Sequence, residues 1–415
     1  MREMKDSGIS WVGEIPKEWS VNRAKYCFVN TKEIAGCMSD RYERLALTMN
    51  GVIKRSKDDS NGLQPEKFET YQILRPDELV FKLIDLQNVS TSRVGLSPYL
   101  GLVSPAYIIL KSNKRVLPAF AEKYFLMLWK NQIFNALGDA GVRSNLNSKD
   151  LLELSIPFPT FDEQQRIADF LDRECGKIDG LKADIQAQID TLEQYKRSVI
   201  TEAVTHGLNP SAPMKDSGIP WVGEIPEYWK VGRIGGLYEL RNQKVSDKDF
   251  MPLSVTMKGI LPQLETAAKT NDGDNRKLVR VGDFAINSRS DRRGSCGISD
   301  YDGSVSLINT ILKPRNRMNA KYYNWLFHTP MFADEFYKWG HGIVDDLWTT
   351  NWSEMKRISI PLPPLDEQQE IADYLDNKCA EIEQIIADKK SQIETLDGYK
   401  KSLIYEYVTG KKEVV

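Results

Sequence analysis

The sequence predicts an α+β protein in which two globular domains are joined by two long antiparallel coiled-coil helices, in a pseudo-two-fold and pseudo-circular arrangement. Three observations lead to this prediction. The 415-residue chain repeats itself, apolar residues recur at every seventh position after a duplicated helix-start motif, and short β-type segments with glycine turns lie between the repeated parts. We therefore expect a strap, a globule and a long helix, and then the same three parts again.

The first strap is the segment from Met4 to Trp19, which returns from Met214 to Trp229 with 13 of 16 positions identical. Its glycines and prolines exclude a regular helix, and its tryptophans can anchor an irregular segment against a domain or a helix end. We expect straps over residues 1–19 and 208–229, and we favour structural anchoring over ligand binding for the tryptophans.

The duplicated helix-start motif reads IPFPTFDEQQ from Ile156 and IPLPPLDEQQ from Ile360, 204 positions later. The prolines stiffen an extended approach and cannot lie inside a helix. Asp162 and Asp366 are the predicted N-caps, and the glutamine three residues after each aspartate would complete a capping box. Long helices are expected over residues 161–207 and 365–410.

Apolar residues form a narrow stripe along each predicted helix. In the first helix the seventh positions are Leu171, Ile178, Ile185, Leu192 and Val199, with Leu181, Ile189 and Tyr195 between them. In the second they are Leu375, Ile382, Lys389, Leu396 and Leu403, with Ile385, Ile386, Ile393 and Tyr399 between them. A stripe of this kind needs a partner helix, and the other copy is the obvious one. Lys389 interrupts the stripe, which lowers stability locally and can help to fix the register.

The globules are expected over residues 20–160 and 230–364. Each begins with short strands, including a shared Thr-Met-x-Gly sequence at Thr48 and Thr256 where a strand is expected to end at the glycine. Each continues into a helical stretch, at 119–129 and at 321–327. A last strand, at 154–157 or 358–361, leads into the long helix.

The formal charge of −2 hides an uneven distribution. Residues 20–155 contain 19 Lys and Arg against 14 Asp and Glu, and residues 230–358 contain 20 against 15, a net of +5 in each globule. The remaining segments carry a net of −12. The asymmetry suggests that the globules, rather than the helices, meet a polyanion, although a chance excess remains an alternative.

Polar and basic loops of the globules supply the candidate DNA contacts. Arginine pairs with guanine and asparagine with adenine, while serine and threonine bind phosphates. No acidic residue occurs between Asp85 and Glu122, which favours the loop in that interval. The candidates are Lys54, Arg55, Asn88, Ser92, Arg93, Arg143, Asn287, Arg289, Arg292 and Arg293; the alternative for each loop is a solvated turn.

The sequence lacks the motifs of common enzymes. Phosphate-binding, dinucleotide-binding, zinc-protease and methyltransferase signatures are all missing, and the three histidines are too scattered for a metal cluster. The five cysteines form no C-x-x-C pair, so we expect reduced, structural thiols. With no apolar run of about eighteen residues and no signal-peptide pattern, the chain is predicted to be a non-catalytic, soluble, cytoplasmic protein.

The two straps, the two helix motifs and the two dissimilar globules resemble the DNA-specificity subunit of type I restriction-modification enzymes, over essentially the whole chain. The resemblance implies that each globule is a target recognition domain for one half of a split, asymmetric DNA site, with the paired helices as a ruler. It also implies two methyltransferase subunits and two motor nuclease subunits as partners. S-adenosylmethionine, ATP and magnesium would belong to those partners, and this chain would bind no cofactor or metal.

By the same analogy, the repeated helices and straps are the natural docking surface for two identical partners. The residues expected there are Glu163, Gln164, Gln165, Glu367, Gln368 and Gln369, although helix capping alone would also explain them. The competing hypothesis is a scaffold that does not bind DNA, in which a coiled coil holds two other binding modules apart.

Overall fold

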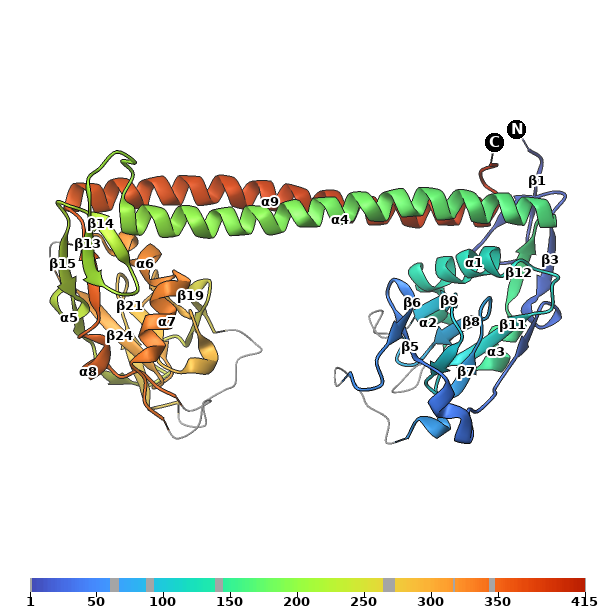
Figure 1. Cartoon of the computed structure of the whole chain (residues 1–415), viewed down its shortest axis with the longest axis horizontal. Helices are drawn as coiled ribbons and strands as arrows, with labels where there is room; N and C mark the ends of the chain where they lie inside the picture. Colours follow the sequence, from blue (N-terminus) through green and yellow to red (C-terminus); the bar gives the residue numbers. More distant parts are fainter. Residues whose placement is uncertain are drawn as a thin grey trace. The chain divides into compact units, whose positions relative to one another are not determined.

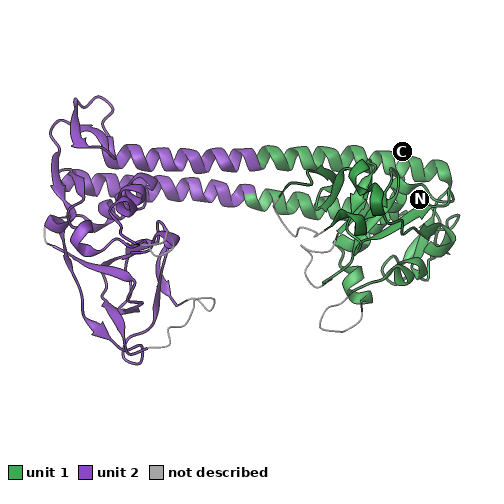
Figure 2. Cartoon of the chain, turned by 60° about the horizontal axis from the view of Figure 1, so that its bottom comes forward, with its two compact units in different colours: residues 1–185, 390–415 green, residues 186–389 purple. Residues whose placement is uncertain are grey.

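A computed structural model describes residues 2–59, 67–86, 93–138, 145–263, 273–315, 318–342 and 348–414. The chain forms two compact units (Figure 1). Unit 1 comprises residues 1–185 and 390–415, and unit 2 comprises residues 186–389. Figure 2 shows that each unit contains one globule and part of both long helices, and that both chain termini belong to unit 1.

The long helices are α4 (Phe161–His206) and α9 (Leu365–Val408), and within each unit they pair antiparallel. In unit 1, Asp179 accepts a hydrogen bond from Lys400 at 2.6 Å and Lys182 donates to Asp397 at 2.5 Å. In unit 2, Gln188 accepts from Lys389 at 2.5 Å, and Lys196 pairs with Glu383. Residue numbers fall along α9 as they rise along α4, so the predicted antiparallel pairing is confirmed.

The stripe of seventh-position residues forms part of the core of each unit. Leu171 and Ile178 of α4 pack with Leu403 of α9 in the core of unit 1, and Val199 packs with Leu375 in the core of unit 2. The residues expected between them are divided: Ile189 and Ile386 are buried, whereas Leu181, Tyr195, Ile385 and Tyr399 are between 45% and 58% exposed. A pair of helices has only a narrow contact line, so these side chains face outward.

The straps are short hairpins. The first pairs β1 (Met4–Asp6) with β2 (Glu14–Pro16), and the second pairs β13 (Met214–Ile219) with β14 (Gly223–Pro226). Trp19 and Trp229, which follow the hairpins, are 1% and 0% exposed and belong to the two cores. The two tryptophans therefore anchor the straps in the cores, as predicted.

One four-stranded antiparallel sheet recurs in both globules with the same strand order. In unit 1 the order is β4-β11-β8-β9, with β4 (Phe28–Asn30), β8 (Leu79–Lys82), β9 (Arg93–Leu96) and β11 (Ile108–Ser112). In unit 2 it is β16-β24-β21-β22, with β16 (Tyr238–Leu240), β21 (Phe284–Asn287), β22 (Cys296–Ile298) and β24 (Asn309–Pro314).

A second set of strands also recurs. Unit 1 has the order β6-β5-β10-β7, with β5 (Arg44–Thr48), β6 (Gly51–Arg55), β7 (Gln72–Leu74) and β10 (Gly101–Val103), and β5 runs parallel to β10. Unit 2 has the hairpin β18 (Leu253–Thr256) and β19 (Gly259–Pro262) beside β17 (Lys244–Val245), β20 (Arg276–Val279) and β23 (Gly303–Val305). A parallel bridge between Pro252 and Ser304 joins the hairpin to β23, so the two arrangements match.

Helices and a closing strand complete each globule. The predicted helical stretches are α1 (Pro118–Lys130) and α6 (Ala320–Phe327), which lie beside the long helices (Figure 1). The last strands, β12 (Ser155–Phe158) and β25 (Ser359–Leu362), pair with the first strands, β3 (Ser20–Arg23) and β15 (Lys230–Arg233). The shorter helices are α2 (Ile133–Leu137), α3 (Ser148–Glu153), α5 (Ile234–Leu237), α7 (Pro330–Lys338) and α8 (Trp352–Met355). The α+β prediction is confirmed.

The five cysteines are free, and four of them are buried. Burial raises the pKa of Cys27 to about 11.

Over the described ranges of the chain, no helix is both long enough and apolar enough to cross a membrane.

Candidate functional site

The shared Thr-Met-x-Gly sequence forms a hairpin tip in both globules. Thr48 Oγ1 donates to the carbonyl oxygen of Gly51 at 2.8 Å, and Thr256 Oγ1 donates to that of Gly259 at 2.9 Å. Both glycines have a positive φ, of 98° and 102°, which favours glycine. The expectation that a strand ends at the glycine was wrong, because the glycine opens the returning strand. The second strand of the unit 1 hairpin carries two candidates for DNA contact.

Those two candidates, Lys54 and Arg55, border a hollow of about 450 Å³ in unit 1. Lys54 pairs with Glu43 at 2.6 Å, which raises the pKa of Lys54 through the hydrogen bond between them. Arg55 pairs with Asp59 at 2.6 Å. Arg41, Arg44 and Lys57 also line the hollow, with Asp40 and Glu43. Basic residues therefore outnumber acidic ones, and three of them, Arg41, Arg44 and Lys57, are not among the ten predicted contacts.

Arg93, the next candidate, starts β9 and is only partly exposed. Its guanidinium donates to the carbonyl oxygen of Leu47 at 3.4 Å, so it braces the hairpin from the neighbouring sheet. Three further candidates, Asn88, Ser92 and Arg143, lie outside the described residues.

The loop after β21 is held by hydrogen bonds of its backbone and of buried polar side chains. Asn287 is 6% exposed, and its Oδ1 accepts from the backbone N–H of Arg289 at 3.1 Å. The hydroxyl of Tyr337 donates to the carbonyl oxygens of Asn287 and Arg292, at 3.1 and 3.4 Å. Ser290 N–H donates to the carbonyl of Trp348. Asn287 thus shapes the loop from inside, and its predicted DNA contact remains untested.

The arginines of this loop point outward. The side chains of Arg289, Arg292 and Arg293 are 33%, 68% and 53% exposed. Asp291 lies 3.7 Å from the Nε atoms of both Arg289 and Arg292, and Arg293 pairs with Asp334 and lies over the ring of Tyr337. Exposed ion pairs of this kind contribute little stability. A phosphate or a base edge could therefore replace the aspartates at small cost.

The structure provides no grouping for metal chemistry within the residues it describes: no cluster of three or more His, Cys, Asp or Glu side chains could hold an ion. The two globules present basic and hydrogen-bonding groups on a framework of paired strands, which suits recognition of a polyanion.

The first turn of each long helix joins the helix to the strap of the same unit. Glu163 accepts from Trp19 Nε1 at 2.9 Å and from Arg2 at 2.6 Å, and Glu163 raises the pKa of Arg2 through their hydrogen bond. In unit 2, Glu367 accepts from Trp229 Nε1 at 2.8 Å and from the hydroxyl of Tyr228 at 3.0 Å. Arg2 was not anticipated from the sequence, because its equivalent at position 212 is alanine.

The neighbouring glutamines join each long helix to its globule. Gln164 Oε1 accepts from the backbone N–H of Leu117, the residue before α1, at 2.8 Å. Gln368 Oε1 accepts from the N–H of Asn319, the residue before α6, at 2.8 Å. Both side chains are buried, and each also donates to a proline carbonyl of the approach segment. The structure therefore gives both glutamines an internal role, and their predicted contact with a partner remains untested.

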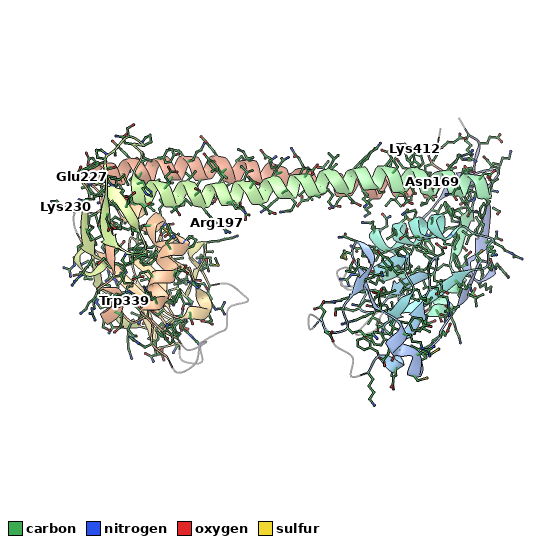
Figure 3. The ribbon with its side chains drawn as sticks, in the orientation of Figure 1. Asp169, Arg197, Glu227, Lys230, Trp339 and Lys412 are labelled. Carbon is green, nitrogen blue, oxygen red and sulfur yellow. The ribbon has the colours of Figure 1, made fainter. Side chains whose placement is uncertain are left out.

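Of the six predicted docking residues, Gln165 and Gln369 are the ones whose side chains are exposed. Each donates to an aspartate four residues later, Asp169 or Asp373, at 2.8 Å; Asp169 is labelled in Figure 3.

The prediction that Asp162 and Asp366 are the N-caps of the long helices was wrong. α4 begins at Phe161, and the hydroxyl of Thr160 accepts from Glu163 N–H, while α9 begins one residue before Asp366. Thr160 stands just before the helix, where a threonine hydroxyl can accept from the third helical N–H, and Asp162 lies in the first turn, where its negative charge also suits the helix N-terminus.

Comparison with known proteins identifies related sequences. The family model described as "Type I restriction modification DNA specificity domain" matches residues 84–191 and 226–395, more than half of the chain. A putative type I restriction enzyme MjaX specificity subunit from Methanocaldococcus jannaschii is 24% identical over 443 residues, covering 97% of this chain and 96% of that protein. A type I restriction enzyme MjaVIII specificity subunit from the same organism is 23% identical, covering 76% and 75%.

A solved structure shares the fold. A chain from a type I R-M system, studied for its complex assembly and conformational transition, superposes with a TM-score of 0.69 at 13% sequence identity. The match covers 96% of this chain and 99% of the other.

Proposed function

The chain belongs to the type I restriction modification DNA specificity domain family, and from this premise we propose that it reads an asymmetric, bipartite DNA site with one globule for each half-site. It acts as a specificity subunit, which selects the sequence, and not as an enzyme. The proposed location is the cytoplasm.

The observation that carries the proposal is a shared framework with unlike loops. The order of the four-stranded antiparallel sheet and the hairpin tips are the same in both units, and the second set of strands matches through the Pro252–Ser304 bridge. Counted from the tip glycine, Lys54 and Arg55 of the unit 1 hairpin correspond to Pro262 and Gln263 in unit 2. Two readers that share a scaffold but differ in their polar side chains fit two different half-sites.

The long helices supply the spacer in this proposal. α4 and α9 each pass from one unit into the other, so their lengths would determine how many base pairs between the half-sites go unread. Readers with two related DNA-binding parts commonly contact half-sites separated by about one turn of DNA or a multiple of it.

Two methyltransferase subunits and two motor nuclease subunits are the proposed partners. The repeated straps and helix starts offer each methyltransferase subunit an equivalent surface, where Gln165 and Gln369 are exposed. S-adenosylmethionine, ATP and magnesium are assigned to these partners, because they carry out the chemistry.

Fluorescence polarisation with the purified chain and duplex DNA tests the proposal. A DNA reader should lose affinity steeply as salt increases, with a log–log slope of about −0.9 per neutralised phosphate. The alternative, a scaffold that does not bind DNA, predicts no saturable binding at low salt, and that result would refute DNA recognition.

The substitution Arg292→Ala tests the unit 2 loop. Arg292 has the most exposed guanidinium of the three, so its loss should weaken or relax recognition of one half-site by about 1–3 kcal/mol if it reads a base. The matched control is Arg173→Ala, since Arg173 is similarly exposed at 62% but lies on α4 and pairs with Glu174. If both variants bind DNA as tightly as the parent chain, Arg292 does not contact DNA.

A further inference from the structure

The last turns of α4 and α9 are equivalent in the repeat but differ in two bulky residues. The sequence Val199-Ile200-Thr201-Glu202-Ala203-Val204 corresponds to Leu403-Ile404-Tyr405-Glu406-Tyr407-Val408. Thr201 and Ala203 therefore stand where α9 has tyrosines. The two ends of the repeat cannot present the same surface.

In unit 1 the tyrosines fill the space at the helix end. The ring of Tyr407 packs against Phe170 of α4, with 4.4 Å between ring centroids and a tilt of 37°. The hydroxyl of Tyr405 donates to the carbonyl oxygen of Val12 in the strap at 3.2 Å. Glu406 pairs with Lys412 at 2.8 Å. Tyr405, Glu406 and Tyr407 therefore each have a partner within unit 1.

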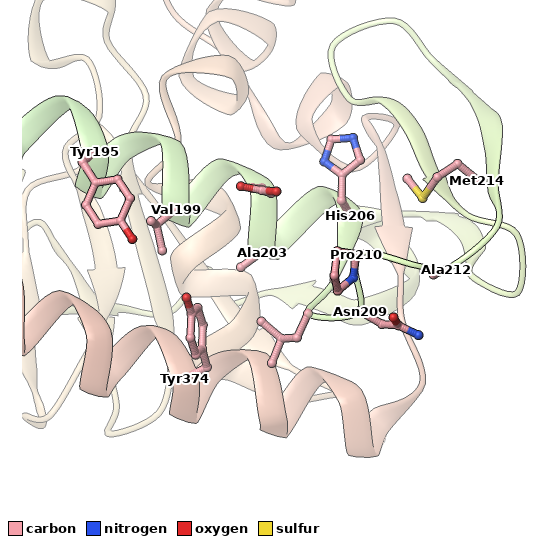
Figure 4. Close-up of a pocket in the computed structure, with 12 residues that line it drawn as sticks. Tyr195, Val199, Ala203, His206, Asn209, Pro210, Ala212, Met214 and Tyr374 are labelled. Carbon is pink, nitrogen blue, oxygen red and sulfur yellow. The ribbon is translucent and has the colours of Figure 1, made fainter.

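In unit 2 the same place is a cavity of about 470 Å³ (Figure 4). Tyr374, the equivalent of Phe170, and Tyr195 project toward it from the two helices, and Ala203 forms part of its wall. Leu208 and Met214 supply further apolar surface. Tyr374 is 40% exposed and Tyr195 49%. In unit 1 the ring of Tyr407 packs on Phe170, whereas Ala203, at the equivalent position, has no ring to pack on Tyr374.

The rim of the cavity carries an acceptor. Glu202 is exposed and lines the cavity. Within the described part of the chain it has no ion-pair partner, unlike Glu406, which it matches in the repeat. A side chain with an aromatic body and a polar tip, such as tyrosine or tryptophan, would match both the apolar wall and the carboxylate.

We propose that the cavity at the end of α4 receives an aromatic side chain of the methyltransferase subunit, packed on Tyr374 as Tyr407 packs on Phe170. This inference rests on the proposed function, since it concerns one of the two docking surfaces assigned there. Its consequence is that the two surfaces are unequal: the partner at unit 2 is anchored by its own aromatic residue, while unit 1 supplies that ring itself.

The substitution Ala203→Tyr tests this proposal by placing the unit 1 residue into the unit 2 cavity. Native mass spectrometry of the full chain with its purified methyltransferase subunit should give two bound subunits for the parent chain. The variant should bind one subunit as before and the other at least about tenfold more weakly, since buried aromatic anchors dominate interfaces. Two subunits bound with unchanged affinity would overturn the proposal.

A control and a second variant keep the outcome clear. Glu193→Tyr adds the same ring to an exposed position of α4 that does not line the cavity, and it should leave both subunits bound. Tyr374→Ala removes the ring on which the partner would pack, without filling the cavity, and should weaken the same single site. If Ala203→Tyr fails to fold, unchanged binding by Tyr374→Ala refutes the proposal.

DNA binding separates this inference from the proposed function. A chain that binds DNA with a steep salt dependence, and that keeps two subunits in both cavity variants, retains its function as a specificity subunit and loses the aromatic anchor. A chain that binds neither DNA nor the methyltransferase subunit loses both.

Discussion

At the scale of single residues, the first turns of α4 and α9 hold each long helix to its strap and to its globule. Trp19 and Trp229 bring an indole N–H to Glu163 and Glu367, while Gln164 and Gln368 bind the backbone before α1 and α6. A repeated motif can therefore be maintained by internal hydrogen bonds, whether or not a partner also contacts it.

The tryptophan hydrogen bonds should be measurable in stability. Trp19→Phe or Trp229→Phe keeps a large ring but removes the donor to a carboxylate. We expect each to lower the free energy of unfolding by about 1–3 kcal/mol, because the acceptor loses a partner in a buried setting. Urea denaturation measures this, with Tyr26→Phe, at a side chain 54% exposed, as the control. Losses no larger than that of the control would show that the junction is not energetically important.

The cysteines should differ sharply in reactivity. Burial raises the pKa of the Cys27, Cys175, Cys296 and Cys379 thiols, while Cys37 is exposed. Since the thiolate is the reactive form, one thiol per folded chain should react quickly with an aromatic disulfide reagent at pH 8, and Cys37→Ser should remove that reaction. Rapid modification of two or more thiols would contradict the packing.

At the scale of elements, patterns that are local in sequence were predictable and long-range pairings were not. The seventh-position stripe predicted α4 and α9, and helical stretches were expected where α1 and α6 lie. The parallel pairing of β5 with β10 depends on residues far apart in the chain, which composition does not reveal. Asn287 looks like a loop residue by type, but the tertiary fold buries it.

The hairpin glycines provide an element-scale test. Gly51 and Gly259 adopt a φ near +100°, so replacement by alanine should cost about 1 kcal/mol or more in unfolding free energy. Gly180 lies within α4, and a Cβ added there would meet no other atom within 4 Å beyond the neighbouring helix backbone, so Gly180→Ala should instead stabilise the chain by about 0.5–1 kcal/mol. Thermal denaturation distinguishes the two signs, and a stabilising Gly51→Ala would contradict the turn geometry.

At the scale of the whole molecule, the chain is organised as a closed cycle of equivalent parts. In unit 1 the N-terminal strap packs on the end of α9: Gly410 lies against Pro16 and Trp19, and Lys411 donates to the carbonyl of Glu14. In unit 2 the second strap packs on the end of α4 in the same way, with Gly207 against Trp229. The contacts between strap and helix end are therefore alike at the chain termini and at the connection between α4 and β13, so the termini could lie at either place.

A circular permutant tests this organisation. Joining the present termini and opening the chain near Pro210, an exposed residue between α4 and β13, should give a protein that folds and binds DNA as the parent chain does. Circular dichroism and fluorescence polarisation measure both properties. An insoluble product would count against the cycle.

The central claim is that two unlike globules read two unlike half-sites. Methylome sequencing of cells that express this chain with its methyltransferase subunit tests it most directly. The account predicts modified sites made of two different short sequences, separated by a fixed number of unspecified base pairs. A single uninterrupted recognition sequence, or two identical halves, would contradict it.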